Sequence, residues 1–173
     1  YNSPKNYSDY DGKKAKSEID ITQRLNDAME SHYQELQQYY KKHGLIMSVF
    51  YFINKVRTGG DWDLKNQGDW NLVKNQDYVY NGITIRSDEP GNIHFGYVGS
   101  VIFDAETLQA GAGVYQILSD TSKPEFYSSY FDDPIDSMNV MYGYLLKNGS
   151  SYSFPGYTIT IEEFEKTYRE THK

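Results

Sequence analysis

The sequence predicts one helix-dominated α+β domain with a small antiparallel β-hairpin or sheet. Apolar residues recur at three- and four-residue steps over residues 17–57, which is the spacing of amphipathic helices. An Asn-Gly pair at 81–82 separates two short runs of β-branched and aromatic residues, which is typical of a β-hairpin. The 173 residues suffice for a single core. We therefore expect a flexible N-terminal arm over residues 1–16, where small and polar residues prevail, and one domain over residues 17–173.

Two helices are expected before residue 60. The first covers about residues 17–42, whose apolar stripe is formed by Ile21, Leu25, Met29, Tyr33, Leu36 and Tyr40. Gly44 follows this stretch and supplies a helix end. The second helix covers residues 45–57 and is apolar on more of its circumference. We expect it to be the central buried helix of the domain, ended by Gly59 and Gly60.

The middle of the chain predicts a hairpin followed by a glycine-rich helix. Residues 78–85 form the hairpin, because Asn-Gly accepts the positive φ angles of a type I′ turn. His94 alternates with apolar neighbours and is expected at the end of a strand. Residues 98–118 mix apolar residues with Gly and Ala, and here we expect a close-packed helix interrupted near Gly111 and Gly113.

The last third of the chain predicts a helix, a strand and a final helix. Asp133 is followed by proline and is a natural N-cap for a helix that ends at Gly149. Residues 157–161 are expected to form a strand. The spacing of Thr160 and Glu163 is that of a capping box, which opens the last helix.

Composition and charge restrict the function. The net charge of −7 opposes binding to nucleic acid, which depends largely on Lys and Arg neutralising phosphates, so a nuclease would need a locally basic site. The 18 Tyr residues suit stacking on flat ligands such as sugars or bases, and they suit a polar-edged core equally well. The absence of Cys excludes disulfides and thiolate zinc sites, and no apolar run approaches the length of a membrane span.

We expect no metal ion and no other cofactor. The four His residues are scattered, no pairing of His and carboxylate recurs at a ligand spacing, and no nucleotide-binding loop is present. The chain begins at Tyr1 without Met, so we expect it to be the processed or C-terminal part of a longer protein.

Four polar segments occur in order along the chain, and the first three contain glycine. They are Gly59–Lys65, Gly91–Gly96, Ala110–Gln116 and Asp132–Asp136, with Gly143 and Tyr144 one helix further on. Together these segments resemble the motifs of the bacterial polymorphic toxin type 44 family. Two positions depart from the family pattern, which has proline in place of Asp61 and an aromatic residue in place of Leu64. The resemblance implies a toxin domain at the C-terminus of a large secreted bacterial protein, used against competing cells and neutralised by a cognate immunity protein.

The candidate catalytic groups in these segments are Asp63, Lys65, His94, Asp133 and Asp136. On an extended segment Asp63 and Lys65 face one way, so the lysine would keep the carboxylate ionised or position a substrate anion; an ordinary surface ion pair is the alternative. His94 has the chemistry of a general acid or base near neutral pH, although a single His is more often structural. Asp133 and Asp136 are equally well explained as a helix cap and its first turn.

The candidate substrate-binding residues are Trp62, Asn92, Glu106, Tyr115 and Gln116. Glu106 is also a candidate acid, because it precedes a glycine-containing helical stretch that would line a cleft. Polar residues beside glycines in distant segments are not expected as independent surface loops. We therefore expect the candidate groups to line a single cleft.

Three functions remain open. The first is hydrolysis of bacterial cell-wall peptidoglycan by two of the candidate carboxylates, which lie about 5–5.5 Å apart in retaining glycosidases and about 6.5–9.5 Å apart in inverting ones. The second is a metal-independent ribonuclease with His94 as base and Lys65 stabilising the phosphorane. The third is a non-catalytic binding module. The acidic net charge favours the first. We expect a monomer whose partners are the immunity protein and the substrate polymer.

Overall fold

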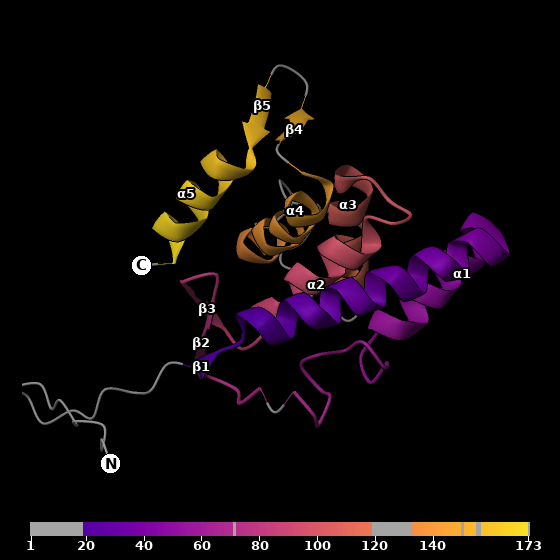
Figure 1. Cartoon of the computed structure of the whole chain (residues 1–173), viewed down its shortest axis with the longest axis horizontal. Coiled ribbons are helices and arrows are strands. Elements are labelled where there is room, and N and C mark those ends of the chain that lie inside the picture. The colour runs from indigo at the N-terminus through magenta and orange to yellow at the C-terminus, as the bar shows by residue number, and fades with distance from the viewer. Residues whose placement is uncertain (1–18, 71, 119–132, 150, 155–156, 173) are drawn as a thin grey trace, which may run out of the picture.

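The computed structural model describes residues 19–70, 72–118, 133–149, 151–154 and 157–172 (Figure 1). The arm expected over residues 1–16 lies outside this part of the chain. The elements follow in the order β1 (Ile19–Asp20), α1 (Thr22–Val56), β2 (Asp77–Tyr80), β3 (Ile83–Arg86), α2 (Glu89–Gly99), α3 (Ala105–Leu118), α4 (Pro134–Asn148), β4 (Ser151–Phe154), β5 (Tyr157–Thr160) and α5 (Ile161–Thr171). The prediction of a helix-dominated α+β fold with small antiparallel strands is confirmed.

The centre of the fold is the crossing of α2 and α4, whose backbones touch. A Cβ atom at Gly96 would lie 1.9 Å from the carbonyl oxygen of Val140, and one at Gly143 would lie 1.9 Å from that of Ile93. Only glycine leaves room for so close an approach. These two residues therefore let the helices meet without side chains between them, and α1 and α3 pack around the pair (Figure 1).

The prediction of a strand end around His94 is wrong, because residues 91–96 belong to α2. The alternation of polar and apolar residues has another cause, since Asn92 and His94 each have a partner on a different helix. Glycine lowers helix propensity by about 1 kcal/mol relative to alanine, which also argued against a helix here. The packing against α4 outweighs that local preference.

α1 is a helical hairpin rather than one straight helix. Its backbone leaves helical geometry at Gly44, where φ is 76° and ψ is 179°. The two arms run side by side, because the rings of Tyr39 and Tyr51 stack 4.0 Å apart and Lys55 Nζ lies 3.4 Å from Glu35 Oε1. The prediction of two helices that meet at Gly44 is confirmed.

The second arm of α1 is not the central buried helix that its composition predicts. Most of its large apolar side chains have exposed fractions between 48% and 72%: Leu45, Ile46, Met47, Phe50 and Ile53. Ser48 and Phe52 are the residues of this arm that are buried. The prediction was wrong because composition counts apolar residues without showing which of them another element covers. The central position belongs to the crossing of α2 and α4.

β1, β2 and β3 form one small sheet, in which the predicted hairpin is confirmed. β2 and β3 pair antiparallel, and the turn residues Asn81 and Gly82 have φ angles of 51° and 69°. β1 pairs parallel with β2, so residues Ile19–Asp20 form a strand where the sequence predicted the start of a helix. The partner of β1 comes from a distant segment, which helical spacing cannot reveal.

α3 runs without interruption through Gly111 and Gly113, so the break predicted there is wrong. The break lies earlier, at residues 100–104. Asp104 explains it, because its Oδ1 accepts a hydrogen bond from the backbone N–H of Thr107 at 2.8 Å and so caps a new helix. Glycine inside a helix is tolerated at a cost of about 1 kcal/mol.

The helix, strand and helix predicted for the last third are confirmed as α4, β5 and α5, and the additional strand β4 pairs with β5. Asp133 caps α4, since its Oδ1 accepts the backbone N–H of Ile135 at 2.9 Å. Thr160 and Glu163 form the predicted capping box of α5. Polar side chains thus fix where both helices begin.

Replacing Thr160 with alanine should destabilise the domain by about 1 kcal/mol. Its Oγ1 accepts the backbone N–H of Glu163 at 3.2 Å, and alanine leaves that donor unpaired. Urea unfolding measures the loss. Thr167→Ala, at an exposed position inside α5, is the matched control and should stay within about 0.5 kcal/mol of the wild type. Equal losses in the two variants would contradict the role of the cap.

Candidate functional site

The predicted site residues on α2 face two different parts of the molecule. Asn92 and His94 are two positions apart, so their side chains point about 200° apart around the helix axis. Asn92 contacts Asp136 at the start of α4, whereas His94 contacts His32 on α1. The candidate residues therefore belong to two groups, one beside α1 and one where α2 and α4 begin.

The group beside α1 joins Trp62, His32 and His94. The His32 ring stacks on the Trp62 indole, with centroids 4.7 Å apart and planes inclined by 15°. His32 Nδ1 lies 2.7 Å from His94 Nε2, so one of these nitrogens donates a hydrogen to the other. Trp62 and His94 are exposed by only 3% and 1%. Burial, and then the neighbouring His32, lower the pKa of His94 to about 3. His94 is therefore a neutral histidine of the core.

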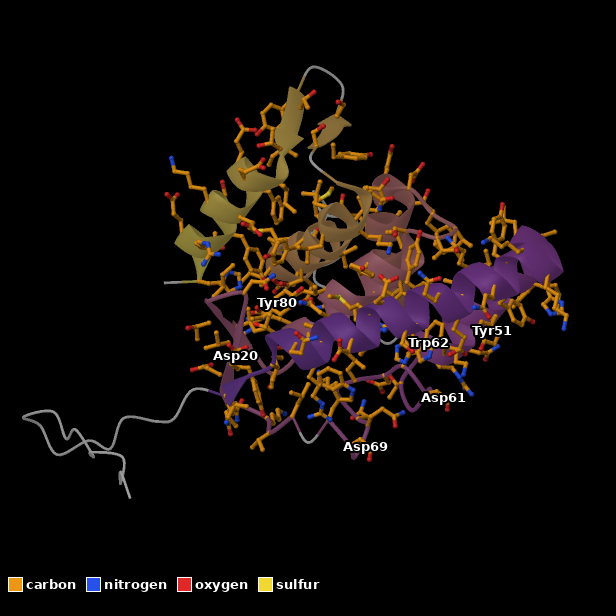
Figure 2. All side chains as sticks on the ribbon, in the orientation of Figure 1. Asp20, Tyr51, Asp61, Trp62, Asp69 and Tyr80 are labelled. Atoms are coloured by element: carbon orange, nitrogen blue, oxygen red, sulfur yellow. The ribbon has the colours of Figure 1, made fainter. Side chains whose placement is uncertain are left out.

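Asp63 and Lys65 lie in the loop that follows α1. Asp63 Oδ2 accepts hydrogen bonds from the backbone N–H of Gly59 at 2.8 Å and from Asn66 Nδ2 at 2.6 Å. Lys65 is exposed. Figure 2 shows the neighbouring Trp62 turned toward α1. The Asp63 carboxylate thus links two positions of the loop, while Trp62 is held by its stacking on His32.

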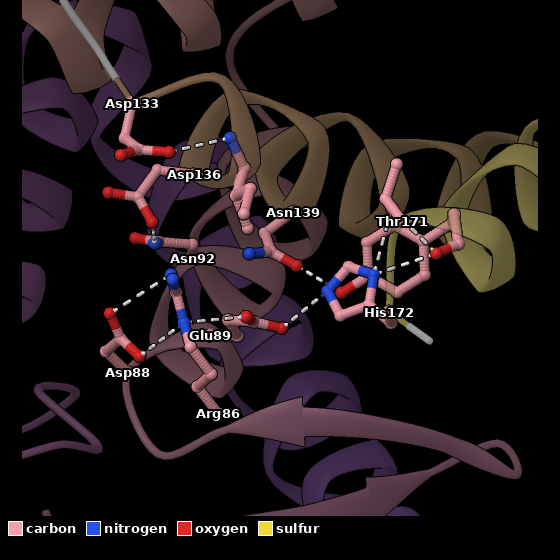
Figure 3. A network of polar contacts seen from close by, with 11 residues as sticks. Arg86, Asp88, Glu89, Asn92, Asp133, Asp136, Asn139, Thr171 and His172 are labelled. Atoms are coloured by element: carbon pink, nitrogen blue, oxygen red, sulfur yellow. Dashed lines mark hydrogen bonds and ion pairs between the residues drawn. The ribbon is translucent and has the colours of Figure 1, made fainter. Parts of the chain in front are cut away.

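The second group surrounds Arg86, which ends β3 and faces the first turns of α2 and α4 (Figure 3). We call this group the Arg86 cluster; its members are Arg86, Asp88, Glu89, Asn92, Asp133, Asp136, Asn139 and His172. Arg86 Nε lies 3.0 Å from Glu89 Oε1 and 3.3 Å from Asp88 Oδ1. Burial opposes the charge of the guanidinium, but the carboxylates of Asp88, Glu89, Asp136 and Asp133 raise the pKa of Arg86. The cluster thus gathers these carboxylates around a cation.

Glu89 is the buried acid of the cluster, with an exposed fraction of 1%. Burial raises its pKa, although His172 and Arg86 oppose the shift. His172 Nδ1 lies 2.8 Å from the carbonyl oxygen of Tyr168. A carbonyl oxygen can only accept a hydrogen bond, so His172 Nδ1 carries the hydrogen. The 3.0 Å contact between His172 Nε2 and Glu89 Oε2 then requires a proton shared between the two groups. Glu89 is therefore a buried carboxyl group that shares a proton with a neighbouring histidine.

Asp136 is the second carboxylate of the cluster with a defined donor. It lies in the first turn of α4, and Asn92 Nδ2 donates to its Oδ1 at 2.7 Å. The positive end of a helix also stabilises a negative charge at this position. Asp133 turns its carboxylate to the backbone of the same helix as a cap. Asp136 and Glu89 therefore occupy contrasting environments, one rich in donors and one enclosed.

Asn139 is a buried residue of α4 with an unused donor. Its Oδ1 accepts a hydrogen bond from the Tyr168 hydroxyl, while its Nδ2 has no partner among the described residues. An unpaired buried donor costs about 1–3 kcal/mol, which calls for a compensating group. Figure 3 places this nitrogen on the side of the cluster that holds Asn92 and Glu89. It suits a ligand group that accepts a hydrogen bond.

The remaining candidates lie on α3. Glu106 is exposed in its first turn. Tyr115 and Gln116 belong to the same helix, but their side chains lie outside the described part of the chain. Within the described ranges, no three or more His, Cys, Asp or Glu residues are placed to hold a metal ion. Of the helices that the structure describes, none combines the length and apolarity needed to cross a membrane.

Members of the Arg86 cluster that were not predicted as site residues include Arg86, Glu89, Asn139 and His172. Arg86 and Glu89 carry a local signal, because they lie three residues apart at a strand-to-helix junction and Glu89 precedes Pro90 at a helix start. His172 has none, since it reaches Glu89 across 83 positions of the chain. The sequence around Asn139 is that of an ordinary helix, and only the structure shows that this residue is buried.

The chain is thus a small helix-dominated α+β domain. Its Arg86 cluster is a partly buried polar site at the first turns of α2 and α4. The sequence profile of the family described as bacterial toxin 44 matches residues 51–149, more than half of the chain, and the chain belongs to this family. The resemblance seen in the four polar segments is thereby confirmed. Comparisons with curated proteins and with solved structures gave no match.

Family membership makes this chain a toxin effector domain. The matched residues include the end of the second arm of α1 from residue 51 onward, the β2–β3 hairpin and the helices α2, α3 and α4. They also include every member of the Arg86 cluster except His172, which follows α5. The cluster therefore lies almost wholly within the part of the chain that defines the family.

Proposed function

We propose that this toxin domain is a hydrolase that cleaves the glycan of the bacterial cell wall, with the Arg86 cluster as its active site. The observation that carries the proposal is a pair of carboxyl groups in contrasting environments. Burial raises the pKa of Glu89, whereas Asp136 accepts a hydrogen bond at the positive end of α4. Glycosidases need such a pair, one group kept protonated as the acid and one ionised as base or nucleophile.

In this mechanism Glu89 protonates the glycosidic oxygen as its bond to the sugar breaks. His172 shares the proton of Glu89 and so replenishes it between turnovers. Asp136 acts on the opposite side of the bond, either directly at the anomeric carbon or through a water molecule. The unused donor of Asn139 suits a carbonyl or hydroxyl oxygen of the sugar. Glu89 and His172 are both buried, so the mechanism requires the His172 side chain to move before a substrate can reach Glu89.

Charge and burial favour this function over a ribonuclease. RNA would have to approach a chain with a net charge of −7, while a neutral glycan meets no such barrier. His94, the predicted base of the nuclease, is buried and has a pKa of about 3. A general base works best with a pKa near the operating pH. Catalytic roles for Asp63, Lys65 and Asp133 stay predictions.

The toxin setting adds a delivery route and a partner to the proposal. Family membership supports a domain that acts on a competing bacterial cell. In this proposal the domain is carried by a larger secreted protein and acts as a monomer. Family membership also supports neutralisation by a cognate immunity protein. For a wall hydrolase, that partner has to act outside the cytoplasmic membrane, where the glycan lies.

The proposal is tested by incubating the purified chain with two substrates in parallel, peptidoglycan sacculi and total RNA. We expect soluble muropeptides with new reducing ends from the sacculi, and intact RNA. Glu89→Gln and Asp136→Asn should each lower muropeptide release by about 10²–10⁴-fold, the usual range for lost acid–base catalysis. Asp27→Asn is the matched control, an exposed carboxylate of α1 paired with Gln23, and should keep the full rate.

Degraded RNA beside intact sacculi would assign a ribonuclease instead. Full activity in both carboxylate variants would move the site away from the Arg86 cluster. If neither substrate changes while expressing cells still die, the non-catalytic module is the better description. Thermal unfolding followed by circular dichroism shows whether each variant is folded at the assay temperature.

A further inference from the structure

The second arm of α1 carries an apolar surface that the described domain leaves uncovered. We call it the α1 tip patch; its members are Leu45, Ile46, Met47, Phe50 and Ile53, with exposed fractions from 48% to 72%. Ile46, Phe50 and Ile53 follow one another at steps of four and three, so they form a stripe about 10 Å long on one face of the helix. Single exposed apolar residues are normal, but a contiguous stripe marks an interaction surface.

The patch lies at the end of α1 that projects from the rest of the domain. In Figure 1 α1 extends beyond α2, α3 and α4, and the turn between its arms forms the free end. Tyr39 stacks on Tyr51 between the arms, and Leu36 and Phe52 are buried there. The hairpin is therefore held together by residues outside the patch, which stays exposed at the end of α1.

The charge around the patch is positive in a chain that is acidic as a whole. Residues 39–57 contain four Lys or Arg side chains and no Asp or Glu, although the net charge of the chain is −7. Lys41 and Lys42 precede the turn, Arg57 follows the second arm, and all three are exposed. Lys55, the fourth, is paired with carboxylates outside this segment. The uncovered apolar stripe thus has cations at both ends.

We propose that the α1 tip patch docks the domain on an anionic lipid surface. The apolar stripe enters the boundary between headgroups and acyl chains, and Lys41, Lys42 and Arg57 meet the lipid phosphates. A second copy of the chain is a poorer occupant, because a symmetric contact at this tip would bring the cations of both copies together. The contact is peripheral, and it is independent of the Arg86 cluster.

The absence of Cys allows a test by labelling at one position. Ile46→Cys carries an environment-sensitive fluorophore, and Val73→Cys is the matched control at another exposed apolar position, 51% exposed in the loop before β2. With vesicles of phosphatidylglycerol and phosphatidylethanolamine, the emission at position 46 should rise and shift to shorter wavelength, while that at position 73 stays unchanged. Vesicles of phosphatidylcholine alone should give a weaker response, because they lack the negative charge.

Phe50→Asp should lower the vesicle-bound fraction of the unlabelled chain at least about tenfold, because it places a charge in the middle of the stripe. The double variant Lys41→Glu with Lys42→Glu should bind as weakly to anionic vesicles and, unlike the wild type, lose its preference for them. All of these positions are exposed, so thermal unfolding should be unchanged.

A wild-type chain that ignores anionic vesicles overturns the proposal, and so does an equal response at positions 46 and 73. If the chain sediments as a dimer that Phe50→Asp dissociates, and no vesicle binding is seen, the patch belongs to a second copy and the lipid proposal fails.

Discussion

Alanine in place of Gly96 or Gly143 is expected to destabilise the domain by about 3–5 kcal/mol, a large share of the stability of a typical domain. In each case the added Cβ would lie 1.9 Å from a carbonyl oxygen of the facing helix. Because the obstacle is backbone, α2 and α4 have to separate, and the contacts along the whole crossing weaken with them. Urea unfolding followed by circular dichroism measures the loss.

Gly111→Ala is the matched control for these variants. Gly111 is an exposed residue of α3, and a Cβ added there meets nothing within 4 Å. The substitution should therefore be neutral or should stabilise the domain by about 0.5–1 kcal/mol, through the better helix propensity of alanine. A Gly96→Ala chain that unfolds at the urea concentration of the wild type would show that the helices do not meet in this way.

Acidification is expected to weaken the fold through His94. Burial lowers its pKa in the folded state to about 3, whereas the unfolded chain takes up the proton near the usual value of about 6.5. The unfolded state therefore binds more protons between these values. Stability is full above about pH 6.5 and falls by as much as about 1.4 kcal/mol per pH unit as the pH drops toward 3. The lowered pKa of His32 acts in the same direction.

Urea unfolding at about pH 7.5 and about pH 5 measures this effect, and the expected loss is about 2 kcal/mol. His94→Gln should be less stable at both values but should lose much of the difference between them, since glutamine has no proton to gain. His43→Gln, at an exposed position of α1, should keep the wild-type difference. The raised pKa of Glu89 opposes the trend, because that group adds stability as it takes up a proton. An unchanged difference in His94→Gln would remove His94 as the cause.

The helix ends and the hairpin could be predicted because their causes are local. Asn81 and Gly82 fix a turn by their own backbone preference, and the side chains of Asp133 and Thr160 bond to backbone groups two or three residues away. Gly44 was recognised as a helix end for the same reason. None of these features needs knowledge of a distant segment.

Features that depend on long-range contact could not be predicted in the same way. The segment around His94 is helical because it packs against α4. Phe50 is exposed because α2 and α4, and not the second arm of α1, form the centre of the fold. In the candidate site, the link between Asn92 and Asp136 joins two predicted residues. Asp63 and His94 have their hydrogen-bond partners elsewhere, in the loop after α1 and on α1 itself, so these contacts do not link them to Asn92 and Asp136.

The contact between Glu89 and His172 divides the cluster between two parts of the chain. The carboxylates lie inside the segment that matches the family, while the imidazole that shares the proton of Glu89 lies beyond it, after α5. Substitutions in this last helix can therefore retune the acidity of the buried carboxyl without disturbing the glycine contacts between α2 and α4.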